Sequence, residues 1–183
     1  EVCGHKWADI SEGSYGVSLM NDCKYGYSMK NRVMTQTLIK SGTEPNLTAD
    51  QEEHFFTYSL YPHAGTWREA GTEQEALNLN VPAKAVAGAA EKDRMEFLSV
   101  DKRDVVLETV KKAEDGDGVI VRLYEVENAR TKVTLHCAEA IASAEETDLL
   151  ENPIEGALGV KENEIELTIK PYEIRTIRIR TAK

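Results

Sequence analysis

The four histidines are the residues best suited to bind a metal ion, but their spacing does not favour a site. A zinc site needs several His, Cys or carboxylate ligands that converge on one ion. His5 and Asp9 lie four residues apart, and an extended strand would hold their side chains away from each other. Glu53 and His54 are neighbours, so a strand would point them to opposite faces. No HxH, HxD or HExxH spacing occurs, and we expect structural or surface roles for the histidines.

Other catalytic signatures give no positive signal. The segment Gly13-Ser14-Tyr15-Gly16 does not match the GxSxG elbow of a serine nucleophile. No GxGxxG or Walker sequence supports nucleotide binding. Asp115 and Asp117 lack the spacing of an EF-hand, so we interpret them as turn residues. A carboxylate pair for glycoside hydrolysis stays open, because such a pair is formed in space and not in sequence.

Charge and cysteine content narrow the class of protein. The formal net charge is -10, which argues against nucleic acid and against an anionic membrane surface as partners. No apolar run approaches the roughly 20 residues of a membrane-spanning helix, and no signal-peptide pattern is visible. Cys3, Cys23 and Cys137 are an odd number without CxxC spacing, which indicates reduced thiols and a cytoplasmic protein. The first residues lack an initiator methionine, so we expect the chain to continue upstream.

The first half of the chain predicts short strands followed by one helix. Alternation and aromatic or β-branched content indicate strands around Val17–Tyr27, Val33–Ile39 and His54–Tyr61, with a turn at Asn21-Asp22, a polar loop over Ser41–Asp50 and a strand end at Pro62. Helical spacing of apolar residues predicts a helix over residues 67–79. The Ala/Gly-rich stretch 83–96 predicts a linker between a lobe at 1–82 and a lobe at 97–183.

The second half predicts an antiparallel sandwich. Alternating apolar residues indicate strands at 105–108, 119–123, 133–137 and 165–169. The sequence Asp115-Gly116-Asp117-Gly118 predicts a hairpin, because Asp-Gly supplies the positive φ angles of tight turns. The fold class is therefore mostly β, with antiparallel sandwich lobes and one helix between them.

The last strand gives two further expectations. Tyr172 and Ile174 set one alternation phase, whereas Ile177 and Ile179 set the opposite one, which predicts a β-bulge near Arg175-Thr176. The three basic residues of this segment indicate an edge strand whose charges discourage aggregation, with a partner-binding patch as the alternative: Arg175, Arg178 and Arg180.

A series of motifs carries a family resemblance. Over residues 5–69 they are HKWADISE from His5, YGVSLMNDCKYGY from Tyr15, AD at Ala49, EH at Glu53, YSLYPHAG from Tyr58 and WREA from Trp67. Weaker similarity continues at FLSV from Phe97, between Lys111 and Glu125, and at KPYEIRT from Lys170. In order and spacing the chain resembles the C-terminal region of glycoside hydrolase family 38 α-mannosidases of the short bacterial and cytosolic type. The resemblance covers most of the chain, apart from residues 80–96 and 138–163.

The resemblance implies a specific architecture. Family members are retaining α-mannosidases whose zinc ion, aspartate nucleophile and acid/base residue lie in an N-terminal barrel, followed by a helical domain and β-sandwiches. This chain would hold the end of a large mutarotase-like sandwich and a smaller immunoglobulin-like one. It would have no catalytic residue and no cofactor of its own, with zinc in the missing catalytic domain. Its partners would be the rest of its own polypeptide and mannose-containing glycans.

The resemblance also implies candidates for contact with substrate, because sandwich loops of the family reach the rim of the active site. They are Asn21, Asp22, Lys24 and Tyr25 in one turn, and Lys40 and Asp50 in the following loop. Relatives often carry an arginine and then Ser-Pro where this chain has Lys40-Ser41-Gly42. Lysine presents a point charge where arginine presents a fork, which puts a bidentate sugar contact in doubt.

Two alternatives remain open. An autonomous carbohydrate-binding module predicts an exposed aromatic platform, for which Trp7, Trp67 and the tyrosines are available. An oligomerisation domain follows from exposed strand edges, which can pair between chains.

Overall fold

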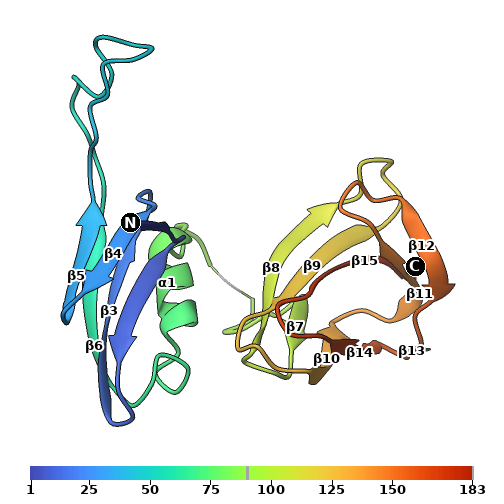
Figure 1. Cartoon of the computed structure of the whole chain (residues 1–183). Coiled ribbons are helices and arrows are strands. Elements are labelled where there is room, and N and C mark those ends of the chain that lie inside the picture. Colours follow the sequence, from blue (N-terminus) through green and yellow to red (C-terminus); the bar gives the residue numbers. More distant parts are fainter. Residues whose placement is uncertain (90, 183) are drawn as a thin grey trace. The chain divides into compact units, whose positions relative to one another are not determined.

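A computed structural model describes residues 1–89 and 91–182, which form two compact units divided after Ala87 (Figure 1). The division falls inside the stretch 83–96, whose described residues contain no helix or strand; residue 90 of that stretch and residue 183 lie outside the described residues. We call residues 1–87 unit 1 and residues from 88 onward unit 2. The fold is mostly β, and every strand pairing in the described chain is antiparallel, which confirms the predicted fold class.

Unit 1 holds two three-stranded sheets and one helix. Its elements are β1 (Val2–Cys3), β2 (Trp7–Ser11), β3 (Tyr15–Asn21), β4 (Gly26–Lys30), β5 (Val33–Thr37), β6 (Tyr58–Ala64) and α1 (Thr72–Asn80). The sheet orders are β1-β4-β5 and β2-β3-β6. The turn at Asn21-Asp22 therefore does not close a hairpin, because β3 and β4 belong to different sheets.

Strand β6 differs from the prediction at both ends. It begins at Tyr58 instead of His54, and it continues through Pro62 to Ala64. The expected strand end at Pro62 is wrong, because β6 is an edge strand in which Pro62 pairs with Val17. A proline on an edge strand can point its missing N–H away from the ladder and so costs the sheet no hydrogen bond.

The helix begins later than predicted. The expected start at Trp67 is wrong, because Gly71 adopts a left-handed conformation with φ of 67° directly before Thr72. Residues 67–71 instead form a turn, and the amide of the preceding Thr66 donates to the Glu69 carboxylate at 2.8 Å. Helix α1 contacts β2 and β3, and its inward residues Thr72 and Ala76 are fully buried.

The other face of the β2-β3-β6 sheet is apolar and is only partly buried within unit 1. Register places Ala8, Leu19 and Leu60 in one cross-strand row and Ile10, Val17 and Pro62 in the next. We call these six residues the open face. Leu60 is 65% exposed. Burial of this face is therefore incomplete within unit 1, whereas Ser18 and Met20 on the face beneath α1 are buried.

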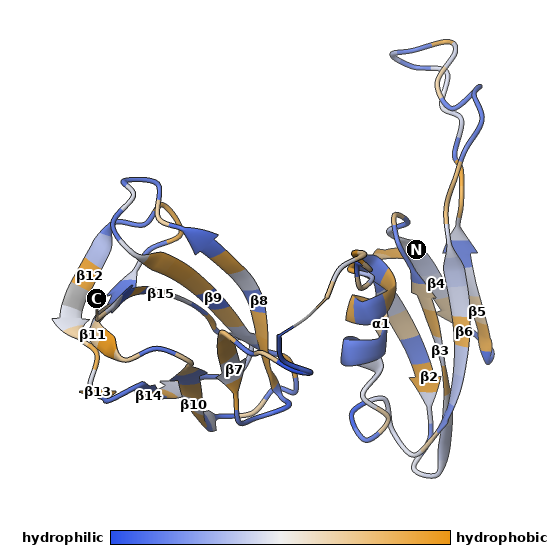
Figure 2. Cartoon of the chain, turned by 180° about the vertical axis from the view of Figure 1, so that it is seen from behind, coloured by the Kyte–Doolittle hydropathy of each residue, from blue (hydrophilic) through white to orange (hydrophobic). Residues whose placement is uncertain are grey.

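Unit 2 is a β-sandwich. Its strands are β7 (Leu98–Val100), β8 (Val105–Lys112), β9 (Val119–Glu125), β10 (Thr131–Cys137), β11 (Ile141–Thr147), β12 (Pro153–Ala157), β13 (Val160–Lys161), β14 (Glu164–Ile169) and β15 (Ile174–Thr181). A four-stranded sheet has the order β13-β14-β10-β7, and a five-stranded sheet has the order β12-β11-β15-β9-β8. Hydrophobic residues are dense along β9, as Figure 2 shows.

The core of unit 2 follows the predicted alternation. Alternating residues of the strands predicted at 119–123, 133–137 and 165–169 are buried and belong to one hydrophobic cluster: Val121, Leu123, Val133, Leu135, Cys137, Ile165, Leu167 and Ile169. The hairpin at Asp115–Gly118 is also confirmed, since it joins β8 to β9 and Gly116 and Gly118 have φ angles of 82° and 96°. A Cβ atom at Gly118 would lie 2.5 Å from the Ile179 carbonyl oxygen, so only glycine fits there.

The predicted bulge at Arg175-Thr176 is wrong. Strand β15 pairs with β9 in continuous register from Ile174 through Ile179. Tyr172 lies before the strand with φ of 55°, and Ile174 is 57% exposed. Neither side chain therefore points into the core, and the apparent change of alternation has no structural counterpart. Register shifts occur instead in β8 at residues 107–109 and in β11 at residues 141–143 and 145–147.

The basic strand is not an edge. Strand β15 is the central strand of its sheet, so the edge interpretation of its arginines is wrong. Arg178, with a side chain 7% exposed, donates to Asp115 at 2.6 Å. Arg180 pairs with Asp117 at 2.7 Å and with Glu145 at 3.0 Å, and Arg175 pairs with Glu146. Because acidic side chains of the same unit neutralise these arginines, the strand does not present a free basic patch.

Candidate substrate-rim site

All six residues predicted to contact substrate line two adjoining pockets of unit 1. Asn21, Asp22 and Tyr25 line a pocket of about 340 Å³. Lys24, Tyr25, Lys40 and Asp50 line a second one of about 270 Å³. The two pockets share Cys23 and Tyr25. We call residues 22–25 the rim loop, and whether it contacts sugar stays a prediction.

Asn21 supports the rim loop from inside. It is 1% exposed, and its side-chain oxygen accepts the backbone amides of Cys23 at 3.1 Å and Lys24 at 2.5 Å. Its side-chain nitrogen donates to the buried Tyr27 hydroxyl. Asn and Asp commonly hold turns by bonding to the backbone two or three residues on. The Asn21 side chain therefore shapes the loop, and the residue also lines the pocket.

Asp22 joins the rim loop to the loop that follows β5. Its backbone amide donates to the Thr57 carbonyl at 3.2 Å, and its carboxylate accepts the Thr57 amide at 3.0 Å. That amide holds the pKa of the exposed Asp22 carboxyl below its ordinary value. The hydrogen bond to Asp22 raises the pKa of the Cys23 thiol, so this cysteine is not prepared as a nucleophile.

The rim loop also presents aromatic and cationic side chains. Tyr25 is 55% exposed and packs edge-on against His5, with 5.1 Å between ring centroids. The Lys24 ammonium lies 4.7 Å from the centroid of the Phe56 ring, a cation–π contact. An exposed aromatic face beside charged groups can contact the C–H face and the hydroxyls of a sugar.

Lys40 and Asp50 lie in the long loop between β5 and β6, which extends beyond the ends of both strands (Figure 1). Both residues are exposed. The Asp50 carboxylate accepts the Ser41 amide at 2.9 Å, and the Asp50 carbonyl lies 3.1 Å from the His54 ring. These contacts close the base of the loop and leave the Lys40 ammonium at the pocket.

A second polar group was missed by sequence reasoning. Asp9 accepts hydrogen bonds from Ser18 at 2.7 Å and from the His63 ring at 2.8 Å, and the Ser18 hydroxyl lies 2.9 Å from the Thr72 hydroxyl. We call these four residues the Asp9 network. Serine nucleophiles need a hydrogen bond to histidine, but here Ser18 and His63 both bind the same Asp9 oxygen. The network therefore connects α1 to its sheet, and polar residues at inward strand positions were the available signal.

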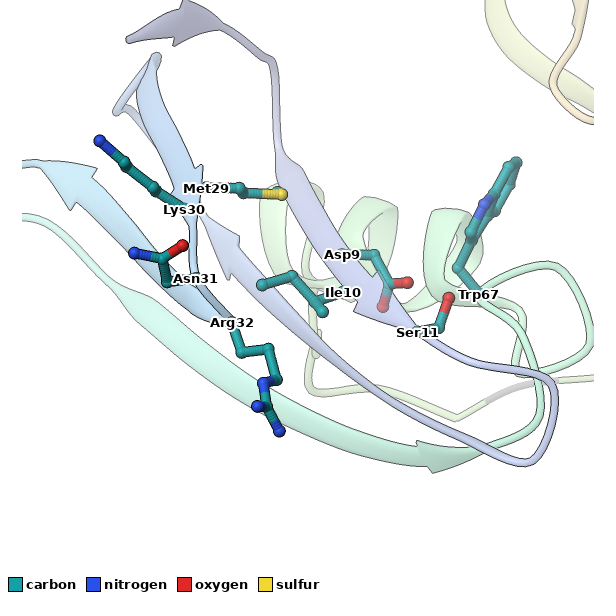
Figure 3. Close-up of a pocket in the computed structure, with 8 residues that line it drawn as sticks. All are labelled: Asp9, Ile10, Ser11, Met29, Lys30, Asn31, Arg32 and Trp67. Atoms are coloured by element: carbon teal, nitrogen blue, oxygen red, sulfur yellow. The ribbon is translucent and has the colours of Figure 1, made fainter.

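Beside this network lies an open groove of about 470 Å³, shown in Figure 3. Asp9, Ile10 and Ser11 come from β2, Met29–Arg32 from the end of β4 and its turn, and Trp67 from the segment after β6. Trp67 packs against Trp7 with 5.0 Å between ring centroids and carries the Arg68 guanidinium on its ring. The two tryptophans available to a carbohydrate-binding module are thus engaged with protein groups.

The described residues do not fit a metal ion. Within 1–89 and 91–182, no group of three or more His, Cys, Asp or Glu side chains is placed to hold one. The His63–Asp9 pair could supply two ligands, and zinc sites in proteins use three or four. We derive no metal chemistry from this chain.

Comparison with known proteins gives the family. The model described as the glycosyl hydrolases family 38 C-terminal domain matches residues 1–48, and the family 38 C-terminal beta sandwich domain matches residues 104–177. The chain belongs to the C-terminal region of glycosyl hydrolase family 38. One family 38 domain matches within each unit, and the resemblance stated from sequence is confirmed.

Curated relatives of this family 38 region are α-mannosidases. Alpha-mannosidase 2C1 of Mus musculus is 38% identical over 184 residues, covering 97% of this chain and 18% of the relative. The Homo sapiens protein of that name is 36% identical over 183 residues, with the same coverage. Alpha-mannosidase G of Dictyostelium discoideum is 36% identical over 189 residues, covering 97% and 17%. The chain therefore spans about a fifth of the length of these relatives.

A solved structure supports the fold. The family 38 glycosyl hydrolase from Enterococcus faecalis superposes with a TM-score of 0.73 at 20% identity, over 97% of this chain and 22% of that protein. An α-mannosidase from E. faecalis V583 gives 0.74 at 20% identity, over 96% and 21%. At this identity the likeness concerns the fold alone.

Proposed function

We propose that this chain is the C-terminal β-sandwich part of an enzyme that hydrolyses terminal α-mannosides. The observation that carries the proposal is similarity over 97% of the chain to proteins named α-mannosidases. The catalytic residues and the zinc ion of such an enzyme would lie outside this chain. The chain alone would then be inactive on α-mannosides.

The first role that we assign to the chain is structural support. The open face would be buried by the part of the polypeptide that the relatives have and this chain does not cover. An exposed apolar sheet face of this kind usually marks a contact surface. The remainder of the same polypeptide is the favoured occupant, because it accounts for about four fifths of the relatives' length.

The second role is contact with the glycan at the rim. Tyr25 supplies an aromatic face, Lys24 and Lys40 supply hydrogen-bond donors, and Asp22 and Asp50 supply acceptors around two adjoining pockets. None of these groups is arranged as a nucleophile with its base, so their effect would be on binding. We therefore expect rim variants to raise KM and to change kcat little.

A cytoplasmic location is part of the proposal. The three cysteines are free, with Cys3 and Cys23 exposed, which suits a reducing compartment. In the described residues no helix is both long enough and apolar enough to cross a bilayer.

The test uses the full-length protein and an aryl α-mannoside. We expect the full-length protein to cleave it and the 183-residue chain alone to be inactive. Tyr25→Ala and Lys40→Ala should each raise KM by about three- to tenfold, as expected for loss of one contact. Hydrolysis by the isolated chain, or a full-length protein without α-mannosidase activity, would contradict the proposal. Tight binding of mannobiose by the isolated chain would favour a carbohydrate-binding module instead.

A further inference from the structure

We propose that Asn80, at the end of α1, and Tyr27, in β4, are positioning residues that set the rim loop through Asn21. The end of the helix would thereby determine how well the rim binds the glycan. The inference rests on the proposed function, because the loop affects catalysis only if it contacts substrate.

Asn80 links the helix end to the last residue of β3. Its side-chain nitrogen donates to the Asn21 carbonyl at 3.0 Å and to the Ala76 carbonyl at 2.8 Å. Ala76 is fully buried against the sheet, so this amide is fixed to an immobile part of the helix. Both amide hydrogens have acceptors, which orients the Asn80 side chain uniquely. Asn80 also lines the pocket that holds Asp22 and Tyr25.

Asn21 passes this constraint to the loop. Its backbone amide donates to the Lys6 carbonyl at 2.8 Å, and its carbonyl is held by Asn80. Its side-chain oxygen then accepts two successive backbone amides, those of Cys23 and Lys24. These two bonds fix the backbone in the middle of the rim loop. A shift of Asn21 would therefore move the side chains of Lys24 and Tyr25.

Tyr27 holds the other end of the Asn21 amide. Its hydroxyl accepts from the Asn21 side chain and, at 3.3 Å, from the Gln36 side chain of β5. The residue is 1% exposed, and burial raises the pKa of its hydroxyl, which stays protonated at neutral pH. A buried amide without a hydrogen-bond partner costs free energy. The rotamer of Asn21 that reaches the Tyr27 hydroxyl is therefore favoured over the others.

These bonds connect the rim loop to the β2-β3-β6 sheet through Asn21, to the β1-β4-β5 sheet through Tyr27, and to α1 through Asn80. The link from Asp22 to Thr57, the residue directly before β6, is exposed. The buried anchor of the rim loop is therefore Asn21. Loss of one member should loosen the loop without unfolding unit 1.

The experiment compares Asn80→Ala with Asn78→Ala in the full-length enzyme. Asn78 lies in the same helix but is exposed, and it accepts a hydrogen bond from Gln74 at 3.2 Å. We expect Asn80→Ala to raise KM for an α-linked mannobiose by about five- to tenfold, the effect of one lost hydrogen bond, with kcat within about twofold. Asn78→Ala should match the wild type. Tyr27→Phe, which keeps the ring, should raise KM in the same direction by about two- to threefold.

A second measurement is independent of activity. In the 183-residue chain, Asn80→Ala should speed hydrogen exchange at the Cys23 and Lys24 amides by about tenfold and leave the Val121 amide of unit 2 unchanged. If Asn80→Ala lowers kcat and the melting temperature together, the variant is destabilised and its KM alone does not decide. The KM of Tyr27→Phe and the exchange rates of the Cys23 and Lys24 amides then decide, and the inference is overturned if neither differs from the wild type. An unchanged KM in Asn80→Ala and Tyr27→Phe, with a raised KM in Tyr25→Ala, overturns the positioning role alone. An unchanged KM in all three variants overturns the proposed rim contact as well.

Discussion

The two units bury their hydrophobic residues in opposite ways. In unit 2 the inner faces of two sheets enclose one cluster that includes Leu135, Ile165 and Ile177, all fully buried. In unit 1 the buried hydrophobic residues among those described are Met20, Tyr27 and Ala76, and the contacts beneath α1 are largely polar. Burial of apolar surface is the main driving force of folding. Unit 2 thus has an enclosed core of its own, whereas we propose that unit 1 completes its core against the rest of the polypeptide.

The largest effect expected is the loss of stability that a cavity in unit 2 would cause. Leu135→Ala should destabilise unit 2 by about 2–5 kcal/mol, the cost of removing a buried leucine side chain. Both tryptophans of the chain are in unit 1, so tryptophan fluorescence reports unit 1, and hydrogen exchange of β10 amides reports unit 2. We expect the exchange to accelerate and the fluorescence transition in urea to stay in place. A fluorescence transition that moves equally would show that the units unfold together.

The next effect depends on the rest of the polypeptide, which we propose covers the open face. Leu60→Asn changes the open face and should alter the stability of the 183-residue chain little, because Leu60 is 65% exposed there. In the full-length protein the same change should cost up to about 1.5–3 kcal/mol, the value of burying a leucine. Urea unfolding of both proteins measures the difference. Leu47→Asn, at a residue 73% exposed in the long loop, is the control. Equal effects of Leu60→Asn in both proteins would contradict the proposed occupant.

A smaller effect concerns the polar packing of unit 1. Ser18→Ala removes the fully buried hydroxyl between Asp9 and Thr72 and should destabilise unit 1 by about 1–3 kcal/mol, because two buried polar groups lose a partner. Ser28→Ala breaks a hydroxyl contact with Thr35 at the surface and should change stability by less than about 0.5 kcal/mol. Tryptophan fluorescence in urea compares the two. Equal effects would mean that the Asp9 network does not hold α1 to the sheet.

Sequence patterns predicted unit 2 better than unit 1 because unit 2 encloses its hydrophobic residues between two sheets. In a closed sandwich each strand has one buried face, so alternation at Val133–Cys137 and Ile165–Ile169 reports the fold directly. Where the rule failed, burial did not follow hydrophobicity. Ile174 is exposed, and Arg178 is buried by ion pairs on the outer face, so the phase of β15 was misjudged.

The candidate site residues came from the resemblance, which said nothing of the contacts that hold them. The resemblance indicated Lys24, Tyr25, Lys40 and Asp50. The structure places these four residues at one pocket, although Tyr25 and Asp50 are far apart in sequence. It did not indicate that Asn21 is buried, or that Asn80 lies beside it, because a contact between a helix end and a turn leaves no periodic signal. Similarly, the Asp9 network depends on the register of β2, β3 and β6, which the sequence does not specify.

The smallest expected effect is the pH response of a surface ion pair in unit 2. The hydrogen bond from Lys161, together with that from Lys132, lowers the pKa of Glu166 from 4.5 to about 2. Because the folded-state pKa lies below the unfolded one, the stabilisation is present above about pH 4.5 and is lost as the pH falls toward 2. Glu166→Gln should therefore lower the melting temperature slightly at pH 6 and not at pH 2, whereas Glu139→Gln, at an exposed position, should not. The effect should also fade in 1 M salt, since exposed charges are screened. A difference that persists at pH 2 would mean that Glu166 acts through packing, and the surface of unit 2 would then contribute to its stability alongside the enclosed core.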